Sequence, residues 1–153
     1  MNEEEFRSVI EESTKSGIVA PHEKKLIDTI LDFERIHVES VMIPVDKISK
    51  VDITAKVGDV KVLARRTHQK MLLVTEEIPT LIVGMIYVFD LLFEKNDEQG
   101  LKNYLRSPIF LPRNTSIEKA FLTLQHKRQS FAVVTDAHGE VTGVVPIERL
   151  LAL

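Results

Sequence analysis

The chain runs Met71-Leu72-Leu73-Val74-Thr75 and then Gly84-Met85-Ile86-Tyr87-Val88-Phe89-Asp90-Leu91-Leu92, and it repeats this layout about sixty residues later. The second copy reads Phe131-Ala132-Val133-Val134-Thr135 and then Gly143-Val144-Val145-Pro146-Ile147-Glu148-Arg149-Leu150-Leu151. Each copy is typical of an apolar strand, a turn, a second strand that begins at glycine, and a short helix. One such unit is too small to bury a core alone, so the duplication predicts two halves that pack around a shared interior.

The residues around these strands complete each repeat. Each is preceded by an amphipathic helix, and in the second repeat Thr115 and Glu118 form a capping-box pattern at its start. The expected elements are helices over 55–66, 88–95, 116–128 and 147–153 and strands over 48–51, 71–75, 81–87, 131–135 and 141–145. Most strand positions are apolar on both faces, so helices must cover the sheets.

Two further helices precede the first repeat and have no counterpart in the second. They are predicted over 2–14, where Asn2 can cap the helix, and over 21–34, where Pro21 suits the first turn. The predicted domains are a helical arm at 1–36, a first repeat at 37–95, a linker at 96–100 and a second repeat at 101–153.

Composition limits the classes of protein to which the chain can belong. With 153 residues, 44% of them hydrophobic, and a net charge of −3, the chain suits one packed domain or a paired double domain, without wholesale nucleic-acid binding. It contains no cysteine, which excludes disulfides and thiolate catalysis. Its five histidines lack metal-site spacing, and no Walker, zinc-protease or nucleophile-elbow motif occurs, so no catalytic or metal-ligating residue is predicted. No apolar run approaches the roughly 20 residues that span a bilayer.

A known family shares these features. The duplication, the Met42-Ile43-Pro44 segment and the Gly84-to-Asp90 ending resemble a tandem cystathionine-β-synthase-type (CBS) domain pair, or Bateman module. This resemblance implies a mixed α/β (α+β) fold of two β-α-β-β-α repeats related by a pseudo-two-fold axis. Residues 17–27 and 38–44 are similar to the cytosolic part of the CorC/HlyC and cyclin-M group, hemolysin-like membrane proteins linked to magnesium and cobalt export.

The resemblance also implies a cellular setting. It places the chain on the cytoplasmic side of the cell membrane as a regulatory module, not an enzyme, attached to a transmembrane domain in a longer parent protein. The implied partners are an adenine nucleotide and a second copy of the chain, with no nucleic acid. The helices at 88–95 and 147–153 are the expected dimer contact, and the arm adds surface to it.

CBS pairs bind adenine nucleotides between their repeats, which implies a site for ATP or AMP, with magnesium accompanying the nucleotide. In the family motif Gly-x-x-Ser/Thr-x-x-Asp, the aspartate holds the ribose and the hydroxyl residue contacts phosphate. Gly84 and Asp90 match this motif, and Tyr87 stands at the hydroxyl position. The remaining implied contacts are Lys70 toward the phosphate, Val45, Met71 and Leu72 along the base, and Pro44 at the adenine edge.

The second repeat departs from that motif. Gly143 matches, but Pro146 and Arg149 replace the hydroxyl residue and the aspartate. A guanidinium has no acceptor for the ribose hydroxyls, so at most one ordinary nucleotide site is expected in the pair.

The residues taken by themselves allow other interpretations. Asp90 also suits a helix start, where the dipole favours a carboxylate, and Tyr87 also suits packing at a strand end. The cations Arg65, Arg66, His68 and Lys70 suit either a solvated helix end or a phosphate clamp. The alternative function is therefore a ligand-free structural dimerisation or interaction module.

Overall fold

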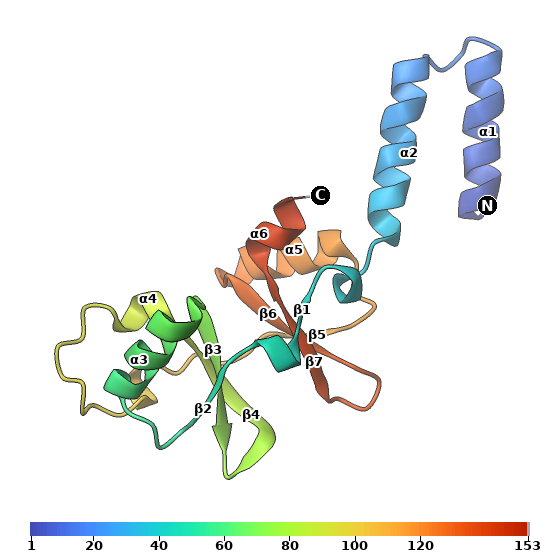
Figure 1. Cartoon of the computed structure of the whole chain (residues 1–153). Coiled ribbons are helices and arrows are strands. Elements are labelled where there is room, and N and C mark those ends of the chain that lie inside the picture. The colour runs from blue at the N-terminus through green and yellow to red at the C-terminus, as the bar shows by residue number, and fades with distance from the viewer. Residues whose placement is uncertain (153) are drawn as a thin grey trace.

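Two sheets with covering helices form the body of the protein, and a helical arm projects from one end (Figure 1). The computed structural model describes residues 1–152, with the backbone alone for residues 78–80. The arm comprises α1 (Glu3–Lys15) and α2 (Pro21–Arg35). The first repeat contains β2 (Lys50–Asp52), α3 (Val57–Thr67), β3 (Met71–Glu76), β4 (Ile78–Tyr87) and α4 (Val88–Leu91). The second contains β5 (Phe110–Pro112), α5 (Ile117–Lys127), β6 (Phe131–Thr135), β7 (Val141–Pro146) and α6 (Ile147–Leu151).

Both repeats have the same topology. In the first, β2 is parallel to β3 and β3 is antiparallel to β4, and in the second β5, β6 and β7 repeat this arrangement. The pairs Leu73↔Met85 and Val133↔Val144 occupy equivalent places in the two sheets. The predicted mixed α/β fold of two β-α-β-β-α repeats is confirmed.

Strand alternation divides the apolar residues into separate cores. On β3, Leu72 and Val74 face α3 and α4, whereas Met71 and Leu73 face the other repeat. The core of the first repeat consists of Val57, Val60, Leu72, Val74, Ile86, Leu91 and Leu101. The core of the second consists of Val38, Leu111, Ile117, Ala120, Leu124, Ala132, Val134, Val145 and Leu150.

The segment that precedes each repeat lies on the other repeat. We call residues 37–45 the first lead-in and residues 101–108 the second lead-in. Within the first, β1 (Ile43–Pro44) pairs with β7 and completes a four-stranded sheet. Within the second, Arg106 exchanges backbone hydrogen bonds with Met85 of β4. Each repeat therefore needs a segment from the other to complete its sheet.

The same exchange occurs in the cores. Val38 of the first lead-in is fully buried in the second repeat, and Leu101 of the second lead-in is 1% exposed in the first. The domain boundaries at 37, 96 and 101 remain a prediction. Residues just after the boundaries at 37 and 101 pack into the core of the other repeat, so the two cores do not divide at these positions.

Two local expectations are wrong. The helix expected over 88–95 ends at Leu91, because the chain turns there and returns to the start of α3. At that point Gln99 O and Asp97 O accept hydrogen bonds from the N–H groups of Val57 and Gly58, the first two residues of α3. Ser116, not Thr115, caps α5, and its Oγ accepts a hydrogen bond from Lys119 N at 3.1 Å. The carbonyl of Thr115 instead accepts from Val38 N of the first lead-in, and this contact buries the residue.

The arm is held by charge and by one end of α2. Arg7 of α1 pairs with Asp28 and Asp32 of α2, and Asn2 caps α1 as predicted. Phe33 and Ile36, at the end of α2 and just after it, pack against the core of the second repeat. No residue of α1 or α2 is buried, so the arm is a projecting hairpin with a small interior.

One glycine inside each second strand, Gly84 in β4 and Gly143 in β7, allows the lead-in to approach. A Cβ added at Gly143 would lie 2.7 Å from Ile43 O, and one added at Gly84 would lie 3.1 Å from Arg106 O. We expect Gly143→Ala to lower the free energy of unfolding by about 1–3 kcal/mol, because the lead-in must shift to make room. Gly100→Ala is the matched control, since no heavy atom lies within 4 Å of its added Cβ. Urea denaturation of the two variants measures the difference, and equal stabilities would contradict the close approach.

Candidate ligand site between the repeats

The two sheets meet in an apolar cluster, which we call the inter-repeat cluster. It consists of Met71, Leu73, Met85, Tyr87, Val133 and Val144, each less than 10% exposed. Four members come from the first repeat and two from the second, so the cluster joins the halves. The polar residues of the predicted site lie at its edge, where β4 ends and α4 begins.

Tyr87 connects the repeats through its hydroxyl group. The phenol donates a hydrogen bond to Gln129 Oε1 at 2.7 Å and accepts one from Ser130 N at 3.1 Å. Its ring makes an edge contact with Phe131, at a centroid distance of 5.2 Å. Burial raises the pKa of this phenol, which therefore stays protonated and able to donate at neutral pH. In this conformation both hydrogen-bonding roles of the hydroxyl are used within the chain.

Asp90 is paired with an arginine from the other lead-in. Arg106 donates from Nε to Asp90 Oδ2 at 2.8 Å and from Nη2 to Oδ1 at 3.1 Å. The guanidinium carbon lies 4.1 Å from the Tyr87 ring centroid, within cation–π range. The hydrogen bond to Asp90 raises the pKa of Arg106. No local pattern in the sequence points to Arg106, because only the crossing of the lead-in brings it beside Asp90, 16 positions earlier in the chain.

The structure brings together part of the predicted nucleotide site. Lys70 is exposed at the start of β3, where its carbonyl accepts a hydrogen bond from Val88 N at 2.9 Å, and Met71 pairs with Tyr87. Val45 packs against the inter-repeat cluster from the first lead-in. Tyr87, Asp90, Lys70 and Met71 are therefore neighbours on one side of the pair.

Two other predicted residues lie elsewhere. Leu72 faces the core of the first repeat and is fully buried, because alternation along β3 turns it away from the inter-repeat cluster. Pro44 pairs with Gly143 of β7 and so belongs to the side of the second repeat. No adenine pocket that includes Asp90 is formed by these two residues in this conformation.

The second repeat has a corresponding contact at Arg149. This residue occupies the place in α6 that Asp90 occupies in α4, and its Nη1 donates to Val41 O at 3.0 Å and to Met42 O at 3.4 Å. Both helices therefore hold the lead-in that crosses from the other repeat. One uses a carboxylate with an arginine, and the other uses an arginine with backbone carbonyls.

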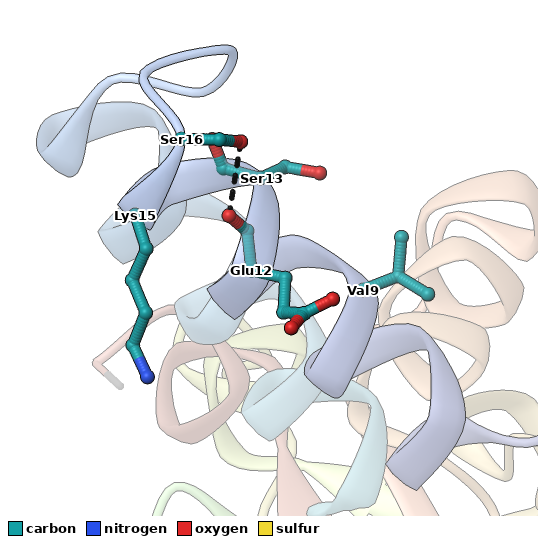
Figure 2. A pocket seen from close by; sticks show the side chains of 5 residues that line it. All are labelled: Val9, Glu12, Ser13, Lys15 and Ser16. Atoms are coloured by element: carbon teal, nitrogen blue, oxygen red, sulfur yellow. Dashed lines mark hydrogen bonds between the residues drawn. The ribbon is translucent and has the colours of Figure 1, made fainter.

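Asp90 lines none of three hollows in the surface. One is a shallow depression on α1 lined by Val9, Glu12, Ser13, Lys15 and Ser16 (Figure 2). Another, of about 420 Å³, lies between the repeats near the start of β4 and is lined by Val45, Lys50, Leu81, Ile82, Phe110, Gly139, Glu140 and Val141. A third lies between α3 and α4. Asp90 instead follows the end of β4, at the opposite end of that strand.

Within residues 1–152, no cluster of three or more His, Asp or Glu side chains is arranged to hold a metal ion. None of the helices in this part of the chain is both long enough and apolar enough to cross a membrane.

Comparison with known proteins identifies the repeated unit. Residues 101–153 match the family described as "CBS domain". This segment, the second repeat, is therefore a CBS domain. The first repeat shares the topology of the second. A solved structure, that of "the CBS domain of the bacterial CNNM/CorC family Mg2+ transporter", is similar over 99% of this chain. That match has a TM-score of 0.76 and 26% identity and covers 94% of the other chain. A second such structure, "in complex with ATP", has a TM-score of 0.74 and 26% identity and covers 86% of this chain and 95% of that one.

Curated relatives of this CBS pair point to the same group. A UPF0053 protein of Mycobacterium bovis is 24% identical over 98% of the chain and 36% of its own length. The "Magnesium and cobalt efflux protein CorC" of Pasteurella multocida is 24% identical over 98% of the chain and 51% of its own length. The CBS pair thus spans about a third to a half of these relatives.

The Tyr87 hydroxyl provides a test of the contact between repeats. We expect Tyr87→Phe to lower the free energy of unfolding by about 1–3 kcal/mol, because Ser130 N–H and the Gln129 side chain lose their partner. Tyr104→Phe is the control, since its hydroxyl joins the second lead-in to Glu94, outside the inter-repeat cluster and at a less buried position. Thermal unfolding of both variants measures the difference, and a neutral Tyr87→Phe would show that the hydroxyl does not hold the repeats together.

Proposed function

We propose that this CBS pair is the cytosolic regulatory module of a CNNM/CorC-type membrane transporter and that it binds an adenine nucleotide beside Asp90. The observation that carries the proposal is the partly exposed Asp90 carboxylate at the start of α4, next to the lead-in of the other repeat. A similar CBS domain, 26% identical, has been solved in complex with ATP. The proposed module has no catalytic role.

The mechanism follows from the Arg106–Asp90 pair. A nucleotide whose ribose bonds Asp90 must displace Arg106, which can then turn to the phosphate together with Lys70. A magnesium ion would take its oxygen ligands mainly from the phosphates and water. Because Arg106 belongs to the crossing lead-in, binding shifts the population of arrangements of the two repeats, and an attached membrane domain can respond.

A second candidate is a ligand-free structural module. It is favoured by the fact that both candidate positions already hold a lead-in, Asp90 through Arg106 and Arg149 through two carbonyls. Tyr87 also fills the position of a smaller hydroxyl residue. In this case the two helix-to-lead-in contacts serve only to fix the arrangement of the repeats.

Calorimetric titration with ATP and AMP, with and without magnesium, separates the two candidates. We expect wild-type protein to release or absorb heat on binding and Asp90→Asn to show none, because an amide loses the charge and one acceptor that hold the ribose hydroxyls. Arg149→Gln is the matched control in the second repeat and should retain binding. A silent wild-type titration would favour the ligand-free module.

The proposed partner of the CBS pair is a second copy. Phe89 and Phe93, in and just after α4, are 71% and 80% exposed, and their rings contact each other edge-to-face. Leu92 between them is 54% exposed, and Leu151 at the equivalent place in the second repeat is 65% exposed. Large exposed apolar groups gathered on one face mark interaction surfaces. We therefore assign the α4 and α6 face to a homodimer.

Replacing Phe93 tests this assignment. We expect Phe93→Asp to weaken dimerisation by at least about tenfold, since a charge would be buried in place of an aromatic anchor. Phe110→Asp serves as the control, because Phe110 is half-exposed on β5, in the sheet of the second repeat, and lines the hollow near the start of β4. Sedimentation velocity over a concentration series gives both dissociation constants, and a monomeric wild type would refute the homodimer.

A further inference from the structure

The groove between α3 and α4 combines an apolar base with basic edges. It has a volume of about 320 Å³, and Ala64, Val88 and Leu92 supply its apolar lining. Lys61, Arg65, His68 and Gln69 line it as well. Lys61 already pairs with Asp97 at 3.1 Å, so Arg65 and His68 supply the basic edge that faces a partner. Arg65 is exposed and makes no salt bridge within residues 1–152. A partner for this groove must offer apolar side chains flanked by negative charge.

Helix α1 has that character. Phe6 and Val9 lie on adjacent turns and are 38% and 48% exposed, although α1 already packs against α2. Glu5 and Glu12 flank them and are exposed. Figure 2 shows the Val9 and Glu12 side chains extending from the same side of the helix. Phe6 and Val9, at i and i+3, thus form a short apolar strip, and Glu5 and Glu12 lie beside its two ends.

The groove and the helix of one copy cannot meet. Helix α2 is anchored on the second repeat through Phe33 and Ile36, and α1 packs beside it, far from α3 and α4 at the other end of the molecule (Figure 1). The Arg7 ion pairs with Asp28 and Asp32 hold α1 in that place. A helix that fills the groove must therefore come from another molecule.

We propose that α1 of a second copy docks in the groove between α3 and α4, and that the exchange is reciprocal in the dimer. The Phe6 and Val9 side chains cover Ala64, Val88 and Leu92, while the glutamates of α1 face Arg65 and His68. This inference rests on the proposed homodimer and names the partner of the arm. Since Leu92 belongs both to the groove and to the exposed α4 face, the docked helix extends the same interface. Contacts between like copies repeat under two-fold symmetry, so both grooves are filled at once.

Charge exchange tests the pairing. We expect Glu12→Lys and Arg65→Glu each to weaken the dimer about tenfold in sedimentation at low salt, since each places two like charges together at two symmetric sites. The double variant should recover most of the affinity. Matched controls are Glu34→Lys, at an exposed position in the last turn of α2, and Lys127→Glu in the last turn of α5, and neither should change the dissociation constant. The docking would be overturned if Phe93→Asp disrupted the dimer but Glu12→Lys and Arg65→Glu did not. The proposed homodimer itself would be unaffected by that result.

Disulfide trapping identifies the partner directly, because the chain has no cysteine of its own. A tagged Val9→Cys chain is mixed with an untagged Leu92→Cys chain and oxidised at micromolar concentration. A disulfide-linked species of mixed mass supports the docking. Linkage of the Val9→Cys chain only to itself would show that arms pair with arms and would overturn it. Failure to link, with dimer present by sedimentation, would also overturn it.

Discussion

The exchange of lead-ins between the repeats is the constraint on which the rest of the structure depends. Backbone N–H and C=O groups at a sheet edge need partners, and a buried apolar face needs a cover. In the first lead-in, Ile43 pairs with the sheet edge of the second repeat and Val38 covers its core. In the second lead-in, Arg106 pairs with the sheet of the first repeat and Leu101 covers its core. Neither half is complete alone, so the pair folds as one unit around the inter-repeat cluster.

This exchange also explains the chemistry of the candidate site. The helix that follows each second strand begins where the other lead-in passes, so residues 90 and 149 touch a segment that belongs to the other repeat. Any ligand at Asp90 competes with that contact. A site of this kind is sensitive to the arrangement of the repeats, because Asp90 is held by a residue of the lead-in from the other repeat. The partly exposed Arg106–Asp90 pair contributes about 1 kcal/mol or less, which a nucleotide can readily offset.

The arm and the α4 face extend this arrangement outward. Both leave apolar side chains exposed that neither repeat covers, and they lie at opposite ends of one copy (Figure 1). The acidic character of α1 and the basic groove beside α4 give these surfaces opposite charges. Dimerisation by exchange of arms would couple the first repeat of one copy to the second repeat of the other, which is how a small module can transmit a change between subunits.

The sequence by itself determined the duplication, the order of elements and most of their bounds, because strand and helix periodicity and the paired glycines are local signals. It also pointed to Tyr87 and Asp90 as neighbours, since they are three positions apart at a strand-to-helix junction. Only the tertiary structure decided that Arg106 holds Asp90, that Leu72 faces the core, and that Pro44 lies on the side of the second repeat. These contacts depend on which face of a strand is turned inward and on which repeat receives each lead-in. Such choices are made by packing across long sequence separations, and no pattern within one segment records them.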